Sequence, residues 1–184
     1  AGCFREIQNS IKDSSKQLLD DVIAEMDLTD ARGRSFFRST RDEITGLNGS
    51  LFVFAGLRTN PETVKGKEGF HRAWVDEANK VSKGSIDLLI PTLRVEGSEL
   101  WWSWNPKNSK DPVDAMFRID GKPRTEATGA PPRSLIIPVS YEDNPFFPEV
   151  LQEEMEYDRR HDPEKYQHVW EGDYQKHSEA RVFK

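Results

Sequence analysis

Two adjacent carboxylates, Asp76 and Glu77, follow a short apolar run at residues 73–75. In nucleotide hydrolases the first acid of such a pair holds magnesium and the second polarises the attacking water, because phosphoryl transfer needs both functions. Successive residues of a strand point to opposite faces, so the two acids can act together only where the strand ends. We therefore predict a strand that ends beside this pair. Taken alone, an acid pair that opens an exposed loop is the commoner explanation.

A second group of polar side chains follows the next predicted strand, which covers residues 99–104. Ser103 and Asn105 lie at its end, directly before Pro106. Adjacent strands of a parallel sheet end at the same edge, so we expect both residues beside the acid pair. A neutral polar side chain there can sense the terminal phosphate and hold the water. The alternative is an ordinary strand-ending Asn before Pro.

Positive charge near these acids could come from Arg58 and Arg94, which lie in or near predicted loops and could contact phosphate. For each of them a solvated surface arginine is the commoner situation. The long segment 106–133 also has a modest basic content that could touch a DNA backbone. A solvated loop is the simpler explanation of its basic residues, which are Lys107, Lys110, Lys122, Arg124 and Arg133.

The 184 residues contain no G-x-x-x-x-G-K-[ST] phosphate loop. The pairs Gly66-Lys67 and Gly121-Lys122 lack the upstream glycine and the following Ser or Thr. A chain without that loop cannot cradle nucleotide phosphates in the usual way. The tryptophans at 101, 102 and 104 could stack on bases, but alternating aromatics in a sheet are more often core or a subunit contact. The four histidines have no metal-ligand spacing.

The composition limits the class of protein. A chain of 184 residues, 35% apolar and 32% charged, fits one globular domain or a large piece of one. The net charge of −6 argues against a self-sufficient DNA-binding domain, and the single cysteine, Cys3, excludes a disulfide framework or a cysteine zinc site. No apolar run approaches the roughly 20 residues of a membrane helix, so we expect a cytoplasmic protein. The chain does not begin with Met and starts in a strand-like stretch, which we interpret as a fragment.

Strands and helices alternate along the sequence, which predicts an α/β fold with a mostly parallel, doubly wound sheet. Asn48-Gly49 indicates a hairpin turn, so the segment 36–54 is expected to be an antiparallel departure. Residues 106–133 are expected to form a mobile surface loop with a short strand near 117–119. Strands are predicted at 3–8, from 36–37 onward, on the two sides of the turn within 43–54, and at 73–77, 99–104 and 134–139. The runs at 51–54 and 134–139 are expected to be buried. Helices are predicted at 11–27 with Ser10 as cap, after Ser82, and at 148–159 and 162–170.

Seven short segments, in order and with matching spacing, make the chain similar to the large terminase subunit of tailed bacteriophages. The resemblance covers about residues 3–173. The segments are Cys3-Phe4-Arg5-Glu6-Ile7-Gln8-Asn9-Ser10, Phe54-Ala55-Gly56-Leu57-Arg58, Ala73-Trp74-Val75-Asp76-Glu77-Ala78, Leu89-Ile90-Pro91-Thr92-Leu93-Arg94, Ser103-Trp104-Asn105-Pro106, Asp143-Asn144-Pro145-Phe146-Phe147-Pro148 and Val169-Trp170-Glu171-Gly172.

The resemblance implies an incomplete P-loop NTPase fold of the additional-strand, catalytic-glutamate type over residues 1–173, followed by a polar tail at 174–184. It implies an ATPase that uses ATP and Mg²⁺ to drive double-stranded DNA into procapsids. Asp76 then matches the magnesium-binding Walker B acid, Glu77 the catalytic acid, and Ser103 and Asn105 the coupling motif. The implied partners are the portal protein, a small terminase subunit and further copies in a ring. The implied location is the host bacterial cytoplasm and, transiently, the portal vertex.

Two departures from the family limit this prediction. The family's phosphate loop lies upstream of the segment that matches Cys3, and its nuclease lies downstream of the segment that matches Gly172. We therefore expect little or no ATP turnover from these 184 residues alone. One alternative is a non-catalytic prophage remnant or interaction module. Another makes Asp76 and Glu77 nuclease metal ligands, but a two-metal site needs further acids that the sequence does not offer.

Overall fold

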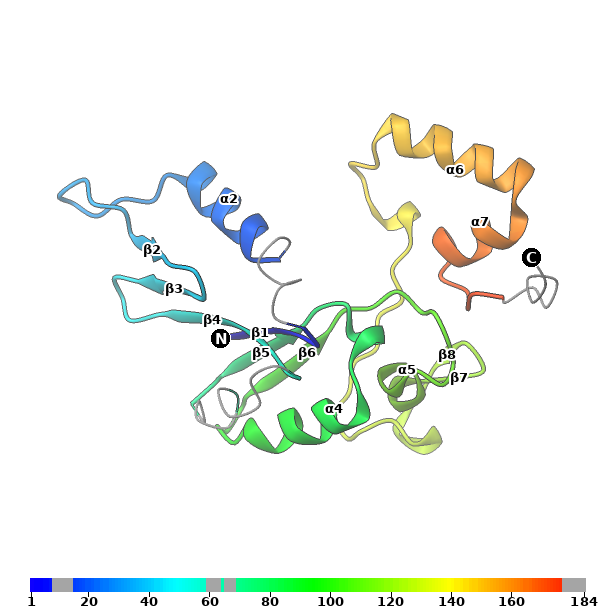
Figure 1. The fold of residues 1–184 in the computed structure, drawn as a ribbon, viewed down its shortest axis with the longest axis horizontal. Coiled ribbons are helices and arrows are strands. Elements are labelled where there is room, and N and C mark those ends of the chain that lie inside the picture. Colours follow the sequence, from blue (N-terminus) through cyan, green and yellow to red (C-terminus); the bar gives the residue numbers. More distant parts are fainter. Residues whose placement is uncertain (8–14, 59–63, 65–68, 177–184) are drawn as a thin grey trace. The chain divides into compact units, whose positions relative to one another are not determined.

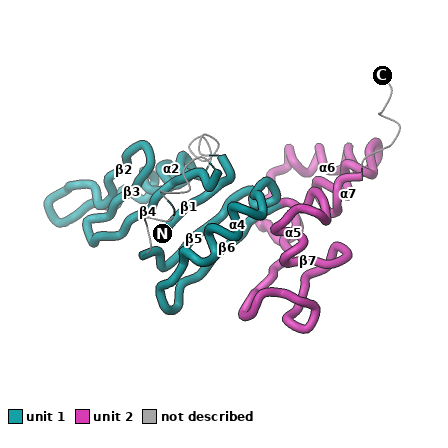
Figure 2. The backbone as a smooth tube through the Cα atoms, turned by 60° about the horizontal axis from the view of Figure 1, so that its bottom comes forward, with its two compact units in different colours: residues 1–104 teal, residues 105–184 magenta. Residues whose placement is uncertain are grey.

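The computed structural model describes residues 1–7, 15–58, 64 and 69–176, which form two compact units. The first unit covers Ala1–Trp104 and the second Asn105–Lys184 (Figure 2). The predicted cap Ser10, most of the segment between Arg58 and Gly69, and the end of the tail at 177–184 lie outside the described residues. The prediction of a single domain over 1–173 stays a prediction.

A six-stranded, mostly parallel sheet forms the first unit, as predicted (Figure 1). Its strand order is β2-β3-β4-β1-β5-β6. The central strand β1 (Gly2–Arg5) is parallel to both β4 (Leu51–Gly56) and β5 (Arg72–Val75), and β6 (Glu99–Trp102) is parallel to β5. All four strands therefore end at one edge of the sheet, which is where ligands bind in open α/β folds.

The predicted hairpin is confirmed and carries one more strand. β3 (Glu43–Gly46) pairs antiparallel with β4, and β2 (Phe37–Ser39) adds an antiparallel strand beyond β3. Gly49 has φ +82° at the turn, a value that glycine adopts without a steric cost. The Asn48 side chain accepts a hydrogen bond from the Ser50 N–H (3.0 Å), which closes the same turn.

Both faces of the central strands are buried, which explains their apolar residues. On one face Cys3, Ile44 and Phe54 form a cluster, against which α2 (Gln17–Met26) packs Leu19 and Ile23. Helix α2 lies within the predicted range 11–27. Helix α4 (Lys83–Leu89) lies on the other side of the sheet from α2 (Figure 1). It begins where the sequence predicts, because the Ser82 hydroxyl accepts a hydrogen bond from Ser85 N–H (3.2 Å).

Two predictions for the second unit are wrong. Residues 106–133 are not a bare loop, because α5 (Pro112–Phe117) buries Val113, Asp114 and Phe117. The predicted short strand there is confirmed as β7 (Arg118–Ile119), paired with β8 (Lys122–Pro123). The predicted buried strand at 134–139 has no regular secondary structure, and its apolar side chains are exposed, by 82% for Leu135, 67% for Ile137 and 76% for Val139.

The two predicted C-terminal helices are confirmed as α6 (Glu149–His161) and α7 (Pro163–Val169). They are joined through Asp158, which accepts hydrogen bonds from Lys165 Nζ (2.8 Å) and Trp170 Nε1 (3.0 Å). The first residue of the predicted tail, Tyr174, is anchored to the rest of unit 2, because its hydroxyl donates a hydrogen bond to the buried Asp114 carboxylate (2.6 Å). Unit 2 is therefore held by polar contacts as much as by apolar packing.

We expect this chain to associate with itself through its edge strand β6. It ends the strand order of unit 1, and its Trp101 is 58% exposed. A strand at the end of a sheet that carries an exposed aromatic side chain invites pairing with another chain. We expect light scattering to give a mass that rises with concentration, and Trp101→Lys to reduce that rise. A monomer mass for the wild type at every concentration would count against this expectation.

Candidate phosphoryl-transfer site

Strand β5 ends at Val75, so the acid pair lies in the turn that follows it. The Asp76 N–H still donates to Phe4 C=O (2.9 Å) and extends the pairing with β1 by one residue. Glu77 has φ +48° and ψ +44°, a left-handed conformation that an L-residue adopts at a cost of about 1–2 kcal/mol. This turn removes the strand alternation, so both carboxylates lie against the same arginine, Arg5 at the end of β1.

Five hydrogen bonds converge on the Asp76 carboxylate. Its Oδ2 accepts from Ser15 Oγ (2.7 Å), Arg5 Nε (3.1 Å) and Arg5 Nη2 (2.5 Å). Its Oδ1 accepts from Ser103 Oγ (3.0 Å) and from the Glu77 N–H (3.0 Å). Burial of Asp76 acts to raise its pKa, but the hydrogen bonds from Ser15, Arg5 and Ser103 and the charge of Arg5 outweigh burial. The pKa of Asp76 is therefore held below its ordinary value of 3.8.

This lowered pKa predicts a specific acid sensitivity. Because Asp76 binds its proton more weakly in the folded state, its carboxylate stabilises the fold above the ordinary pKa of 3.8, and this stabilisation is lost as the pH falls below that value. The free energy of unfolding, measured in urea from about pH 5 to pH 2, is expected to fall more steeply for the wild type than for Asp76→Asn. Asp87→Asn, in an exposed ion pair on α4, is the matched control. Parallel curves for wild type and Asp76→Asn would contradict the prediction.

The Glu77 carboxylate is engaged on both oxygens. Its Oε1 lies 3.2 Å from Arg5 Nη1, and its Oε2 lies 2.5 Å from Lys80 Nζ. The side chains differ in burial: Arg5 is 10% exposed, Asp76 21% and Glu77 38%. Glu77 is therefore the acid of the pair that solvent or a ligand reaches first.

The structure brings Ser103 to the acids, as the strand order predicts. The Ser103 hydroxyl donates to Asp76 and accepts from Trp74 Nε1 (2.9 Å), and its carbonyl accepts from the Ala78 N–H (3.0 Å). Asn105 is the third residue after the end of β6 and is exposed. It is the first residue of the second unit, so the predicted place of its side chain beside the acids stays a prediction.

The two predicted phosphate-binding arginines lie at different places in unit 1. The Arg58 N–H donates to Glu6 C=O (3.0 Å), which puts Arg58 at the same carboxyl edge as the acids, with an exposed side chain. Arg94 precedes the amino end of β6 and donates from Nε to Pro91 C=O (3.0 Å). The acids lie at the carboxyl ends of the parallel strands, which is the opposite edge of the sheet. The geometry therefore favours Arg58 over Arg94 as a phosphate contact.

Sequence reasoning missed Arg5, Ser15 and Lys80 as members of the site. Arg5 ends the first strand and Ser15 is buried just before α2, 71 and 61 residues from Asp76 in the sequence. The parallel pairing of β1 with β5 could have indicated Arg5, because it puts the residue after Phe4 next to the residue after Val75. Nothing in the local sequence distinguishes Ser15 from its neighbour Ser14.

The acid pair offers a magnesium ion two carboxylates, but their hydrogen bonds restrict its access. A magnesium ion in such sites takes one or two carboxylates besides waters and phosphates, which the pair Asp76 and Glu77 could supply. A carboxylate has about four lone-pair directions, however, and Asp76 already accepts five hydrogen bonds. Direct coordination by Asp76 therefore does not fit this arrangement. In the described part of the chain, no three His, Cys, Asp or Glu side chains gather as metal ligands.

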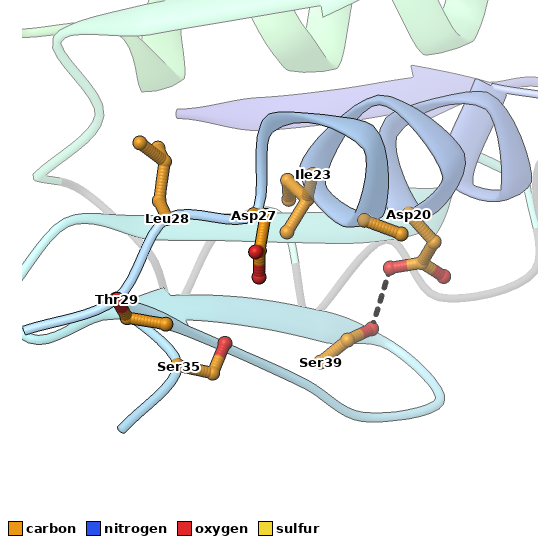
Figure 3. Close-up of a pocket in the computed structure, with 8 residues that line it drawn as sticks. Asp20, Ile23, Asp27, Leu28, Thr29, Ser35 and Ser39 are labelled. Carbon is orange, nitrogen blue, oxygen red and sulfur yellow. Dashed lines mark hydrogen bonds between the residues drawn. The ribbon is translucent and has the colours of Figure 1, made fainter. Parts of the chain in front are cut away.

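A pocket of about 330 Å³ lies elsewhere in unit 1, between α2 and the hairpin (Figure 3). Its wall combines the apolar side chains of Ile23, Ala24 and Leu28 with polar ones, and Asp20 and Ser39 are hydrogen-bonded across one side of it (2.7 Å). None of the predicted site residues lines it. We therefore assign the pocket no part in the chemistry of the acid pair. Among the residues that the structure describes, no helix has the length and apolar character needed to cross a membrane.

Comparison with known proteins identifies the family. Residues 1–173 match the family model described as phage terminase large subunit. Three similar solved structures are of the large terminase from the thermophilic bacteriophage D6E, one of them in complex with ADP. Their TM-scores are 0.67, 0.68 and 0.62, with identities of 14%, 14% and 15%. No curated protein matches the chain at a significant level.

The coverage of these structures is one-sided. They cover 90%, 93% and 90% of this chain, whereas the chain covers only 38%, 39% and 37% of theirs. At such low identity the likeness shows the fold alone, which is the mixed α/β fold with a mostly parallel sheet that the sequence predicts. The family match extends over nearly the whole chain. This chain belongs to the phage terminase large subunit family.

Proposed function

We propose that this chain is a segment of an ATPase that drives double-stranded DNA into the procapsid of a tailed bacteriophage. The observation that carries the proposal is the family match over residues 1–173 together with the cluster of Asp76, Glu77 and Ser103 where parallel strands end. The ADP complex of the D6E large terminase supports a nucleotide as ligand. The partners proposed with it are the portal protein, a small terminase subunit and further copies of the chain in a ring, in the host cytoplasm and at the portal vertex.

Each side chain then has a proposed role. Glu77 is the more exposed acid, and it orients the attacking water by accepting its hydrogen bond. Asp76 is proposed to order the site, because its carboxylate accepts hydrogen bonds from Arg5, Ser15 and Ser103. Arg58 is the nearer candidate for a phosphate contact, and Arg94 is the weaker one. Asn105 is proposed to act with Ser103 at the end of β6.

Ser103 connects β6 to the acid pair. This contact is the physical basis that we propose for coupling between the acid pair and movement of β6. The Ser103 hydroxyl joins Trp74 on β5 to Asp76, so a shift of β6 moves a hydrogen-bond donor of Asp76. Ser103→Ala leaves Trp74 Nε1 without its acceptor and is expected to cost about 1–2 kcal/mol of unfolding free energy. Ser103→Thr keeps the hydroxyl and is the matched control. Urea denaturation that cannot distinguish the two variants would contradict this role.

The 184 residues hold no phosphate-loop sequence, so the proposal includes an expectation for this chain alone. A phosphate-release assay with ATP and Mg²⁺ is expected to show no turnover above that of the Glu77→Gln variant. The phosphate-binding half of the site would have to come from other residues. Robust hydrolysis that depends on Glu77 would overturn this part of the proposal.

A non-catalytic remnant or interaction module is the second candidate. The ion pairs of Arg5 and Lys80 favour it, because both acids are neutralised in the structure. The DNA upstream of the codon for Ala1 distinguishes the candidates. An open reading frame that encodes a phosphate loop supports the motor, and a stop codon supports the remnant.

A further inference from the structure

Arg5 lies between the two acids of the proposed site. Its guanidinium donates through Nε (3.1 Å) and Nη2 (2.5 Å) to Asp76 Oδ2, and its Nη1 lies 3.2 Å from Glu77 Oε1. The Arg5 side chain is 10% exposed, so it is fixed by packing as well as by its charge. One cation therefore holds both carboxylates at once, an arrangement that the forked geometry of arginine permits and lysine cannot reproduce.

Both acids are paired with cations in the described part of the chain. Arg5 forms ion pairs with Asp76 and Glu77, and Lys80 forms a second ion pair with Glu77. A carboxylate already paired with a cation attracts a divalent ion less strongly, because the local field sets that attraction. In addition, Arg5 and Ser15 fill the lone-pair directions of Asp76 Oδ2. Arg5 pairing and direct metal coordination at Asp76 therefore exclude each other.

We propose that Arg5 is an internal counter-ion that keeps the acid pair closed, and that it must release Asp76 before a divalent cation can bind there. This inference deepens the proposed function and rests on it. Arg5 is a positioning residue, since it acts on the acids and not on the reacting atoms. The ligand class that would drive the exchange is a phosphate ester with its divalent ion, because phosphate is an alternative forked partner for a guanidinium.

The test uses divalent-ion binding to this chain, with Mn²⁺ followed by electron paramagnetic resonance and Mg²⁺ by calorimetry. Arg5→Gln is expected to bind Mn²⁺ about tenfold more tightly than the wild type, which corresponds to about 1.4 kcal/mol. The gain must disappear in the double variant Arg5→Gln/Asp76→Asn. Arg72→Gln is the matched control, because it removes an equal charge at the other end of β5, where Arg72 pairs with Glu99. An unchanged or weaker affinity of folded Arg5→Gln would overturn the proposal.

A measurement on the wild type keeps the proposal testable if Arg5→Gln does not fold. The Nε–H resonance of Arg5 reports its bond to Asp76 in a nitrogen–proton NMR spectrum. Saturating Mg²⁺ is expected to shift this resonance, and the same titration of Asp76→Asn is expected to leave it unchanged. No saturable shift in the wild type would overturn the proposal. Both experiments measure binding, so they can fail while Glu77-dependent hydrolysis stands, and hydrolysis can fail while they succeed.

Discussion

Glu77→Gln is expected to abolish ATP hydrolysis in a protein that joins these residues to a phosphate-binding loop. The amide has nearly the same shape but cannot accept the proton of the attacking water, and loss of such a group typically costs about 10²–10⁴-fold in rate. Nucleotide binding is expected to be spared, because the role proposed for Glu77 is to orient the attacking water and not to hold the nucleotide. Phosphate release and nucleotide titration on the same preparations measure the two effects separately.

The control for this experiment is Glu99→Gln. Glu99 is also a half-exposed acid in an arginine ion pair, with Arg72, but it lies at the opposite end of the parallel strands. Its hydrolysis rate is expected to stay at the wild-type level. Retained turnover in Glu77→Gln, at a rate near that of Glu99→Gln, would remove Glu77 from the mechanism. Loss of nucleotide binding in Glu77→Gln would show instead that the site had collapsed.

The sequence was sufficient to predict where the acids lie because that place follows from topology. Parallel neighbours end at one edge, so the residues after Val75 and after Trp102 had to meet, and Ser103 contacts Asp76 as a result. The hairpin was equally predictable, because Asn48-Gly49 is a local signal that needs no knowledge of the rest of the chain. Local signals and strand order together account for the sheet.

Pairings between distant residues account for what the sequence did not predict. Arg5 looks like an ordinary charged residue at a strand end, and only its register with Val75 and Asp76 makes it part of the site. Residues 134–139 have the apolar composition of a buried strand, yet no strand forms there, because composition cannot supply a pairing partner. Asp114 in α5 is a polar residue that is buried, and its partner Tyr174 lies 60 residues away in the sequence, although its other partner, Arg118, is only four residues away.

The segments that carry the family resemblance have different roles in the two units. In unit 1 they supply the acid pair and Ser103. In unit 2 the aromatic residues Tyr141 and Phe147 pack edge-on or tilted against one another and against Trp170, with ring centroids 5.5–6.3 Å apart. Trp170 also donates to Asp158. The motifs at 143–148 and 169–172 are therefore explained by packing, and they need no catalytic role.

Phe4→Ala is expected to have the largest effect on stability of any single substitution considered for unit 1. Phe4 is 1% exposed in the central strand, and its ring packs edge-on against Phe70 with centroids 5.9 Å apart. Removing a buried aromatic ring typically costs about 3–5 kcal/mol, which is a large part of the 5–15 kcal/mol that holds a domain together. Urea denaturation followed by the fluorescence of the sheet tryptophans measures this cost.

Two further variants serve as controls for the stability loss expected of Phe4→Ala. Phe146→Ala removes an identical ring that is 86% exposed, so it is expected to change the unfolding free energy by no more than about 0.5 kcal/mol. Phe4→Leu keeps most of the volume and should fall between the two alanine variants. The Phe4 carbonyl accepts the Asp76 N–H, and Arg5 is the next residue, so the same ring that stabilises β1 also fixes the cation and the first acid. If Phe4→Ala cost no more than Phe146→Ala, β1 could not be the element that positions the acid pair.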